Sequence, residues 1–203
     1  MLKAALYDLV LAGAERRGLH RWRRELLAGV AGDVVEIGAG TGANLAVYGP
    51  GVRRLVLVEP DPAMLERLAR RAAGKATVVA GSAARLPLAD DSVDAVVSTL
   101  VLCSVDRVDA ALAEILRVLR PGGQLHLIEH VAAPAGSSLR RAQHLIAPVW
   151  SRCAGGCSVE LPTREVLAAA GFDVSGLVDD VLGVPVPLVR PVLRGVTGPT
   201  ERT

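Results

Sequence analysis

The sequence predicts a single α/β domain built around a mostly parallel β-sheet, and three observations support this prediction. The length of 203 residues suits one compact domain and leaves little room for a second of ordinary size. Short runs rich in valine and leucine alternate along the chain with helical patterns, which is typical of β-α-β units. These runs lack polar alternation, as expected for strands that are buried on both faces of a sheet.

The chain starts with a helical pattern and continues with alternating strands and helices. Over residues 1–30, apolar side chains recur at three- and four-residue spacings, which predicts helix. We interpret the basic stretch within it, residues 16–24, as a solvated face. The expected strands are residues 34–37, 55–58, 77–79, 95–98, 124–131, 172–178 and 187–193.

Further helices are expected between these strands, and turn residues set their ends. Asp61 is placed to cap the helix that starts at the next residue, and Gly74 to end it. Pro121, followed by two glycines, stops the next helix. The helices expected after the first strand are residues 62–73, about 106–119, 144–150 and 163–170.

Composition and charge exclude several classes of function. The 23 basic and 21 acidic side chains leave a net charge of +2, which gives no electrostatic footprint for nucleic acid. Aromatic residues make up 2% of the chain, whereas proteins that bind RNA or single-stranded DNA need rings on which bases stack. No uncharged apolar run reaches the roughly 18 residues of a membrane span, so we expect at most contact with a membrane surface. Three cysteines and no visible signal peptide favour a reduced, cytoplasmic protein.

A glycine-rich loop follows the first expected strand. Residues 36–44, EIGAGTGAN, place Gly38, Gly40 and Gly42 at alternate positions, and we expect the loop to open a helix. Glycines there permit positive φ and a close approach of the backbone to a ligand. The pattern therefore predicts a nucleotide-type ligand.

Two such ligands fit the loop, and Glu36 distinguishes them. Gly38, Gly40 and Ala43 also match the fingerprint of dinucleotide-binding loops. Glu59 is placed to accept hydrogen bonds from the ribose hydroxyls of either ligand. The carboxylate of Glu36 would repel the pyrophosphate of a dinucleotide. It favours the sulfonium and ammonium of S-adenosylmethionine instead. After the third strand, Ser82 and the backbone of Ala83 are placed to meet the adenine edge.

Five motifs stand in register between about residues 33 and 131: the glycine loop from Glu36 to Gly42, Glu59-Pro60, the loop from Gly81 to Pro87, Asp94 to Ser98, and Leu119 to Gly123. Together they resemble the class I S-adenosylmethionine-dependent methyltransferases. The resemblance implies a Rossmann-like, doubly wound sheet of seven strands in the order 3-2-1-4-5-7-6, with an N-terminal helical lid. It also implies one domain over residues 1–203, with N-terminal helices (1–30), a cofactor-binding half (33–131) and an acceptor-side half (132–203).

The same resemblance implies the cofactor and the residues that bind it. The cofactor is S-adenosylmethionine. The residues expected to bind it are Glu36, Gly38, Gly40, Gly42, Asn44, Glu59, Pro60, Ser82, Ala83 and Leu100. Ser82 departs from the common family pattern, which has aspartate at this position.

A narrower resemblance extends over most of the chain. Residues 99–105 (TLVLCSV), 120–123 (RPGG), 129–131 (EHV), 156–157 (GC) and 163–165 (TRE) are similar to the small alkyl-thiol S-methyltransferases and their bacterial relatives. This resemblance implies a thiol on a small or lipophilic acceptor. A phenol, a quinone, or an oxygen or carbon of a natural product stays open as the acceptor.

Methyl transfer needs few catalytic groups, because the sulfonium already activates the methyl. His130, at the end of the fifth expected strand, is the first candidate for a base or orienting group, with a structural role as the alternative. Cys103 faces the cofactor by family analogy, although a free cysteine is also a small core residue. Tyr7, next to Asp8, resembles a tyrosine of relatives that lies near the cofactor, with simple packing as the alternative.

Other functions stay open beside this one. An NAD-dependent oxidoreductase would share the glycine loop and Glu59. A non-catalytic or pericyclic role would keep the cofactor as a structural element. No metal is expected, because Cys153 and Cys157 fall short of a four-ligand set. The sequence does not indicate an oligomeric state.

Overall fold

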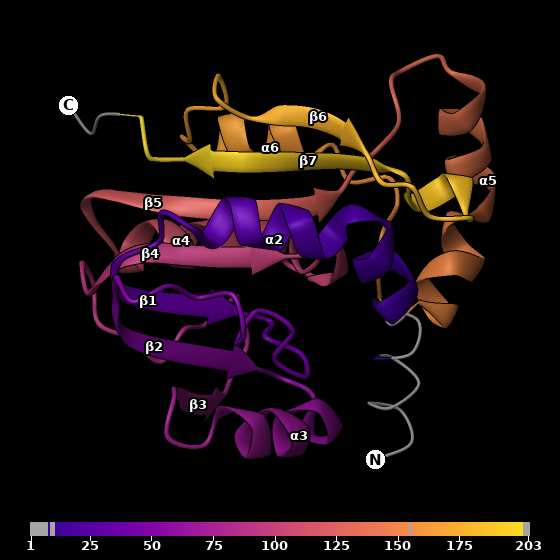
Figure 1. The fold of residues 1–203 in the computed structure, drawn as a ribbon. Coiled ribbons are helices and arrows are strands. Elements are labelled where there is room, and N and C mark those ends of the chain that lie inside the picture. Colours follow the sequence, from indigo (N-terminus) through magenta and orange to yellow (C-terminus); the bar gives the residue numbers. More distant parts are fainter. Residues whose placement is uncertain (1–7, 9–10, 155, 201–203) are drawn as a thin grey trace.

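The computed structural model of the protein describes residues 8, 11–154 and 156–200, and within them it shows a seven-stranded sheet with helices on both faces (Figure 1). The strand order is β3-β2-β1-β4-β5-β7-β6, which confirms the expected order and fold class. Strands β1 to β5 pair in parallel, whereas β7 runs antiparallel to both β5 and β6. The strands are β1 Gly32–Ile37, β2 Val52–Glu59, β3 Thr77–Ala80, β4 Val93–Thr99, β5 Leu119–His130, β6 Val178–Val181 and β7 Pro191–Thr197.

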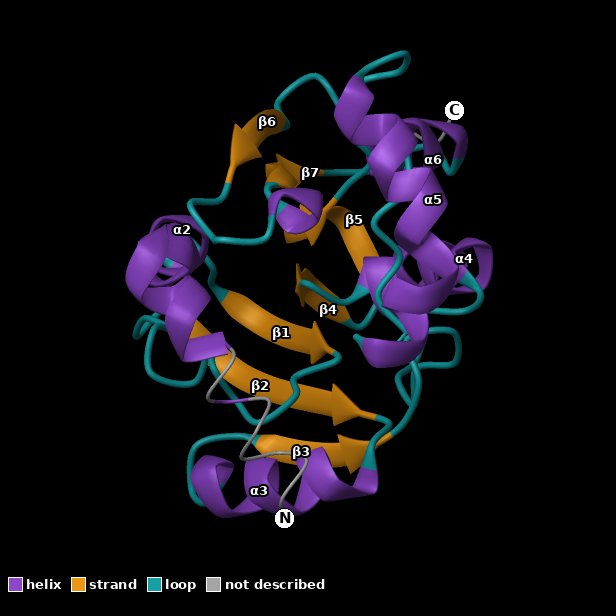
Figure 2. Ribbon diagram, turned by 90° about the vertical axis from the view of Figure 1, so that its right-hand side faces the viewer, coloured by secondary structure: helices purple, strands orange, loops and turns teal. Residues whose placement is uncertain are grey.

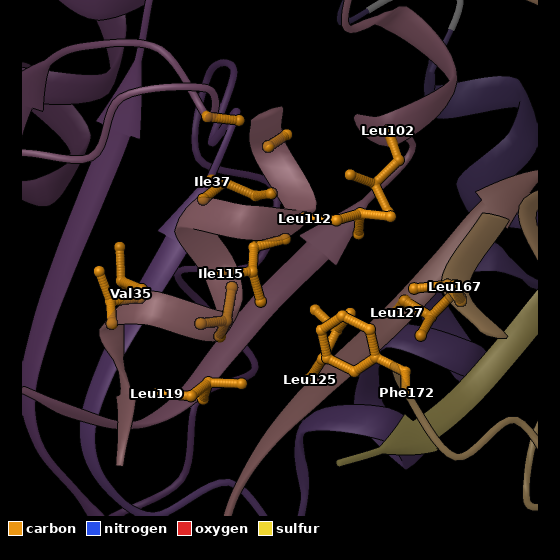
Figure 3. Close-up of a cluster of buried hydrophobic side chains, with 14 of the residues drawn as sticks. Val35, Ile37, Leu102, Leu112, Ile115, Leu119, Leu125, Leu127, Leu167 and Phe172 are labelled. Atoms are coloured by element: carbon orange, nitrogen blue, oxygen red, sulfur yellow. The ribbon is translucent and has the colours of Figure 1, made fainter. Parts of the chain in front are cut away.

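Two pairs of helices cover the two faces of the sheet. On one face, α2 (His20–Leu27) and α3 (Pro62–Ala72) contribute Leu27 and Leu68 to a core that includes Leu57. On the other face, α4 (Val108–Val118) and α6 (Thr163–Ala169) contribute Ile115 and Leu167 to a second core (Figure 3), which also includes Val56 of β2. Successive side chains of β2 therefore point to opposite cores, which is why its sequence is apolar without alternation.

The helix ends follow the expected capping chemistry. The Asp61 side chain accepts hydrogen bonds from the backbone N–H groups of Ala63 and Met64, and Pro62 occupies the first helical position. Ser137 caps α5 (Ser138–Cys153), which is longer than the expected helix at 144–150 and contains Pro148. The described N-terminal helical region runs from residue 11 through η1 (Glu15–Leu19) and α2, and α2 lies along the sheet (Figure 1).

The prediction of the last two strands was wrong in its bounds. Residues 173–177 form a turn region and not a strand, because the Asp173 side chain accepts from Ser175 N–H and Leu177 N–H donates to the carbonyl of Val174. Phe172 packs in the core, and β6 begins only at Val178. In the strand expected at 187–193, residues 187–189 form the 3₁₀ turn η3 (Pro187–Val189) instead. The strand β7 starts only at a second proline, residue 191.

Across the described residues, no helix has both the length and the apolar character needed to cross a membrane.

Candidate functional site

The glycine loop lies at the carboxyl end of β1, at the edge toward which β2 and β3 also point (Figure 2). Gly38 and Gly40 have φ angles of 55° and 58°, a region that favours glycine. A Cβ atom on Gly38 would lie 2.5 Å from a side-chain carbon of Val101, so this position admits no other residue without a shift. The sequence predicted that this loop opens a helix, and this prediction was wrong. Residues 40–47 form consecutive turns instead, in one of which the Gly42 N–H donates to the Ala39 carbonyl at 2.9 Å.

Glu36 lies buried beneath this loop, with 2% of its surface exposed. Its two carboxylate oxygens accept hydrogen bonds from Asn44 Nδ2 at 3.0 Å and from the Tyr48 hydroxyl at 2.7 Å. Burial raises the pKa of Glu36 from 4.5 to about 7, against the opposing effects of these hydrogen bonds and of the Arg23 charge. Near neutral pH this carboxyl therefore exists in both protonation states.

Arg23 connects the N-terminal helices to the same network. Its guanidinium is buried and donates to Asn44 Oδ1 at 2.8 Å and Thr99 Oγ1 at 2.7 Å. It also forms an ion pair with Glu15 at 2.9 Å. The expectation of a solvated face for residues 16–24 is wrong at this position, because Arg23 lies on the inner side of α2 with Trp22 and Leu27.

Glu59 joins the glycine loop to the turn after β2. Its carboxylate accepts hydrogen bonds from Gly40 N–H at 2.8 Å and from Asp61 N–H at 2.9 Å. The chain then enters α3 through Pro60 and Asp61. Glu59 thus holds the backbone of the loop and of the helix entry at fixed positions.

The loop after β3 lies next to Glu59. Gly81 N–H donates to the Glu59 carbonyl, and the Ser82 side chain accepts from Ala84 N–H at 3.2 Å. Ala83 is buried in the core. An open hollow is lined by Ala80, Gly81, Ser82, Arg85, Pro87 and Leu88.

The segment after β4 is held in a constrained conformation. Leu100 has a φ of 63°, which costs of the order of 1–2 kcal/mol for a residue other than glycine. Its N–H donates to the Ile128 carbonyl at 2.7 Å. The buried Glu129 accepts from Val101 N–H at 3.1 Å and Cys103 N–H at 3.4 Å, so it caps the turn η2 (Leu102–Ser104). Burial raises the pKa of Glu129.

His130 ends β5, the strand next to β4. Its Nδ1 atom is buried and has no hydrogen-bond partner among the described residues. Burial lowers the pKa of His130 to about 4, opposed only by the backbone of Val189. The imidazole is therefore uncharged at neutral pH.

Cys103 and the N-terminal segment were the other expected catalytic elements. The Cys103 thiol is buried, and its sulfur lies 3.6 Å from that of Cys157. Tyr7 lies outside the described residues. Its neighbour Asp8 accepts from the Thr41 hydroxyl at 2.5 Å and pairs with Arg71 at 3.0 Å, so Asp8 lies beside the glycine loop.

Comparisons with known proteins agree with this geometry. Residues 35–127 match a family described as "Methyltransferase domain". Over 177 residues, the chain is 38% identical to the human thiol S-methyltransferase TMT1B, covering 80% of this chain and 72% of that protein. The chain belongs to the S-adenosylmethionine-dependent methyltransferases. It is also 37% identical over 131 residues to the ubiquinone/menaquinone biosynthesis C-methyltransferase UbiE of Rubrivivax gelatinosus, covering 62% of this chain and 52% of that one.

A solved structure shows the same fold. Geranyl diphosphate methyltransferase in complex with S-adenosylmethionine superposes with a TM-score of 0.67 at 18% identity, over 98% of this chain and 89% of that one. As a methyltransferase, this chain uses S-adenosylmethionine, and the residues present fit that cofactor. A Cβ on Gly38 would overlap Val101, and the acidic side chains of Glu36 and Glu59 flank the loop. The dinucleotide alternative finds no support in these relatives.

The structure brings most of the expected cofactor residues of this methyltransferase together. The glycine loop, Glu36, Asn44 and Glu59 are linked by hydrogen bonds, and Leu100 precedes the residue that packs on Gly38. The sequence interpretation missed Arg23. Its position four residues after Leu19 and four before Leu27 places it on the buried stripe of the helix, and this spacing was the available signal.

Proposed function

We propose that the protein transfers the methyl group of S-adenosylmethionine to the thiol of a small, apolar acceptor. The observation that supports a thiol is the state of His130, whose buried Nδ1 has no partner and whose pKa is about 4. When bound, the cofactor supplies a methyl group that its sulfonium already activates. The protein then needs to orient the acceptor, exclude water and manage a single proton.

A neutral imidazole of low pKa suits a thiol better than a hydroxyl. A thiol with a pKa of about 8.5 is already a few per cent thiolate near neutral pH. Removing a proton from a phenol of pKa about 10 with a base of pKa about 4 is uphill by about 8 kcal/mol. His130 therefore acts as a hydrogen-bond acceptor that orients the S–H group.

The surroundings of His130 favour an apolar acceptor. Val189, whose backbone faces His130, is a partly buried member of an apolar cluster that includes Leu100, Trp22 and Leu182. Such walls bind apolar molecules and leave orientation to a few polar groups. The name of the human relative TMT1B, a thiol S-methyltransferase, points the same way. The relative UbiE, a C-methyltransferase of quinone biosynthesis, makes a quinone-type acceptor the second candidate.

Cofactor binding falls to the residues that meet at the carboxyl ends of β1 and β2. In this proposal the Glu59 carboxylate accepts hydrogen bonds from the ribose hydroxyls, while Ser82 and Ala83 contact the adenine. Gly38, Gly40, Gly42, Asn44, Pro60 and Leu100 line the site, and Glu36 favours its positive charges. Cys103 shapes the wall near the acceptor, and the described residues of the helical lid meet the glycine loop at Asp8. We expect a cytoplasmic enzyme, in keeping with the free thiols of Cys103 and Cys157.

An acceptor pair with one carbon skeleton tests the proposal. A linear alkyl thiol and the corresponding alcohol are compared at equal concentration, and a phenol and a reduced quinone complete the panel. Release of S-adenosylhomocysteine is measured after calorimetry has established binding of S-adenosylmethionine and not of NAD. We expect turnover with the thiol to exceed that with the alcohol at least a hundredfold. Turnover with the quinone but not the thiol would refute the thiol assignment and leave the methyltransferase intact.

A further inference from the structure

Two cysteines from distant parts of the chain meet beside the site. Cys103 belongs to η2, directly after β4, whereas Cys157 follows α5. Their sulfur atoms lie 3.6 Å apart, and both residues are free thiols. Both are buried, with 3% and 9% of their surfaces exposed. The methyl transfer proposed above uses Cys103 only as part of the wall near the acceptor, and it gives Cys157 no role.

Backbone contacts hold the two segments in this arrangement. The N–H of Ser158 donates to the Cys103 carbonyl at 2.5 Å, one residue from Cys157. A Cβ on Gly156 would lie 3.4 Å from the Ser104 carbonyl, so the two backbones run close together on both sides of the thiols. A disulfide needs a sulfur separation of about 2.05 Å, so the two sulfurs have to approach by roughly 1.5 Å. In this closure the side chains of both cysteines rotate, and the backbone that carries Cys103 shifts toward Cys157.

The two thiols differ in reactivity. Their mutual hydrogen bond lowers the pKa of Cys157 and raises that of Cys103, and burial adds to the rise at Cys103. The thiolate is the reactive form of cysteine, so Cys157 is the attacking residue and Cys103 the resolving one.

We propose that Cys103 and Cys157 form a peroxide-sensitive dithiol site that closes into an intramolecular disulfide and thereby slows methyl transfer. The Cys157 thiolate attacks one oxygen of hydrogen peroxide, which breaks the O–O bond, leaves a sulfenic acid and releases hydroxide. The Cys103 thiol then attacks the sulfenic sulfur, forms the S–S bond and gives up its proton as water leaves. Two thiols are oxidised, and one peroxide is reduced to two waters.

Formation of the disulfide would affect the glycine loop through the backbone of the segment that follows β4. The N–H groups of Cys103 and Val101 donate to the same carboxylate of Glu129, and the Val101 side chain lies against Gly38. Pulling Cys103 toward Cys157 therefore disturbs the contact between Val101 and the glycine loop. This effect on turnover rests on the proposed function, whereas formation of the disulfide does not.

A protein with only these two cysteines gives a clear covalent readout. The chain has three cysteines, so Cys153→Ser leaves Cys103 and Cys157 as the remaining pair. This variant is treated with hydrogen peroxide, quenched, labelled with an alkylating reagent under denaturing conditions and weighed as intact protein. We expect a loss of two hydrogens and of both labels in most molecules, and full recovery of both labels after reduction with dithiothreitol. The double variant Cys153→Ser, Cys157→Ser is the matched control and should keep its single label or carry one oxygen.

The same samples are then assayed for S-adenosylhomocysteine release with whichever acceptor of the panel is used. We expect turnover of the oxidised Cys153→Ser protein to fall at least fivefold and to return with dithiothreitol, while the double variant keeps its own untreated rate. The proposal would be overturned if peroxide left both cysteines of the pair open to labelling. It would also be overturned if peroxide gave cross-linked dimers in place of the internal disulfide. An internal disulfide that leaves turnover unchanged would overturn it as well. Failure of the thiol assignment alone changes the acceptor and not the mass readout.

Discussion

The buried carboxyl of Glu36 makes the stability of the fold depend on pH in an unusual direction. Its pKa in the folded protein is about 7, compared with 4.5 for an ordinary glutamate, because burial penalises the charged form. Below pH 4.5 both the folded and the unfolded chain keep the proton. Between pH 4.5 and 7 the unfolded chain releases it while the folded chain keeps it, so the contribution of Glu36 to stability is lost as the pH rises.

The substitution Glu36→Gln removes this titration and keeps the shape of the side chain. The shift from 4.5 to about 7 corresponds to about 3 kcal/mol of unfolding free energy. We therefore expect the difference in unfolding free energy between Glu36→Gln and the parent protein to move in favour of the variant by about 3 kcal/mol between pH 4.5 and pH 8. Asp33 titrates in the opposite sense, since Arg53 and Arg120 lower its pKa to about 2, but it is present in both proteins and cancels.

Urea unfolding followed by circular dichroism at several pH values measures this difference. Glu66→Gln is the control, because Glu66 is an exposed acid paired with Arg70 on the surface of α3. Its difference from the parent should stay within about 0.5 kcal/mol across the range. A flat difference for Glu36→Gln as well would show that the folded carboxyl titrates normally, and it would refute the assignment of a protonated Glu36 beneath the loop.

Three further predictions concern the same site. Arg23→Met should lower the unfolding free energy by about 3–5 kcal/mol in urea, because it removes the buried guanidinium that pairs with Glu15 and donates to Asn44 and Thr99; a loss below 1 kcal/mol would contradict the buried network. Glu59→Ala should weaken S-adenosylmethionine binding at least tenfold by calorimetry, because both the Gly40 N–H and the ribose hydroxyls lose the carboxylate that accepts their hydrogen bonds. An unchanged affinity would refute the assignment of Glu59 to ribose binding. His130→Ala should lower kcat at least tenfold with less than a threefold change in cofactor affinity; equal turnover would make His130 structural.

The elements that the sequence placed correctly are those with a strong local signal. The valine-rich runs of β1, β2 and β4 are apolar on both faces because helices cover both sides of the sheet. Asp61 and Pro62 mark the start of α3 by a capping chemistry that needs no distant contact. The strand expected at 172–178 failed because turn hydrogen bonds around Asp173 outweigh the β-propensity of its apolar residues.

The residues of the site that sequence reasoning missed depend on tertiary contacts. Arg23 occurs in a stretch of arginines, and only packing of α2 against the sheet decides that this one is buried beside Asn44 and Thr99. The pairing of Cys103 with Cys157 likewise joins segments 54 residues apart. Neither separation leaves a periodic trace in the sequence, whereas the glycine loop and Glu59 belong to local motifs and were found.

The structure also strengthens the choice of ligand on a different ground from the one the sequence offered. Because Glu36 is partly protonated near pH 7 and lies close to Arg23, its charge alone discriminates weakly against a diphosphate. Dinucleotide-binding loops hold their pyrophosphate at the N-terminus of the helix that follows the glycines. In this chain residues 40–47 form turns instead, so the aligned N–H groups of such a helix are missing where a diphosphate would need them. A cofactor without phosphates does not need those N–H groups. The turns after Gly42 are therefore stronger evidence for S-adenosylmethionine than the charge of Glu36 is.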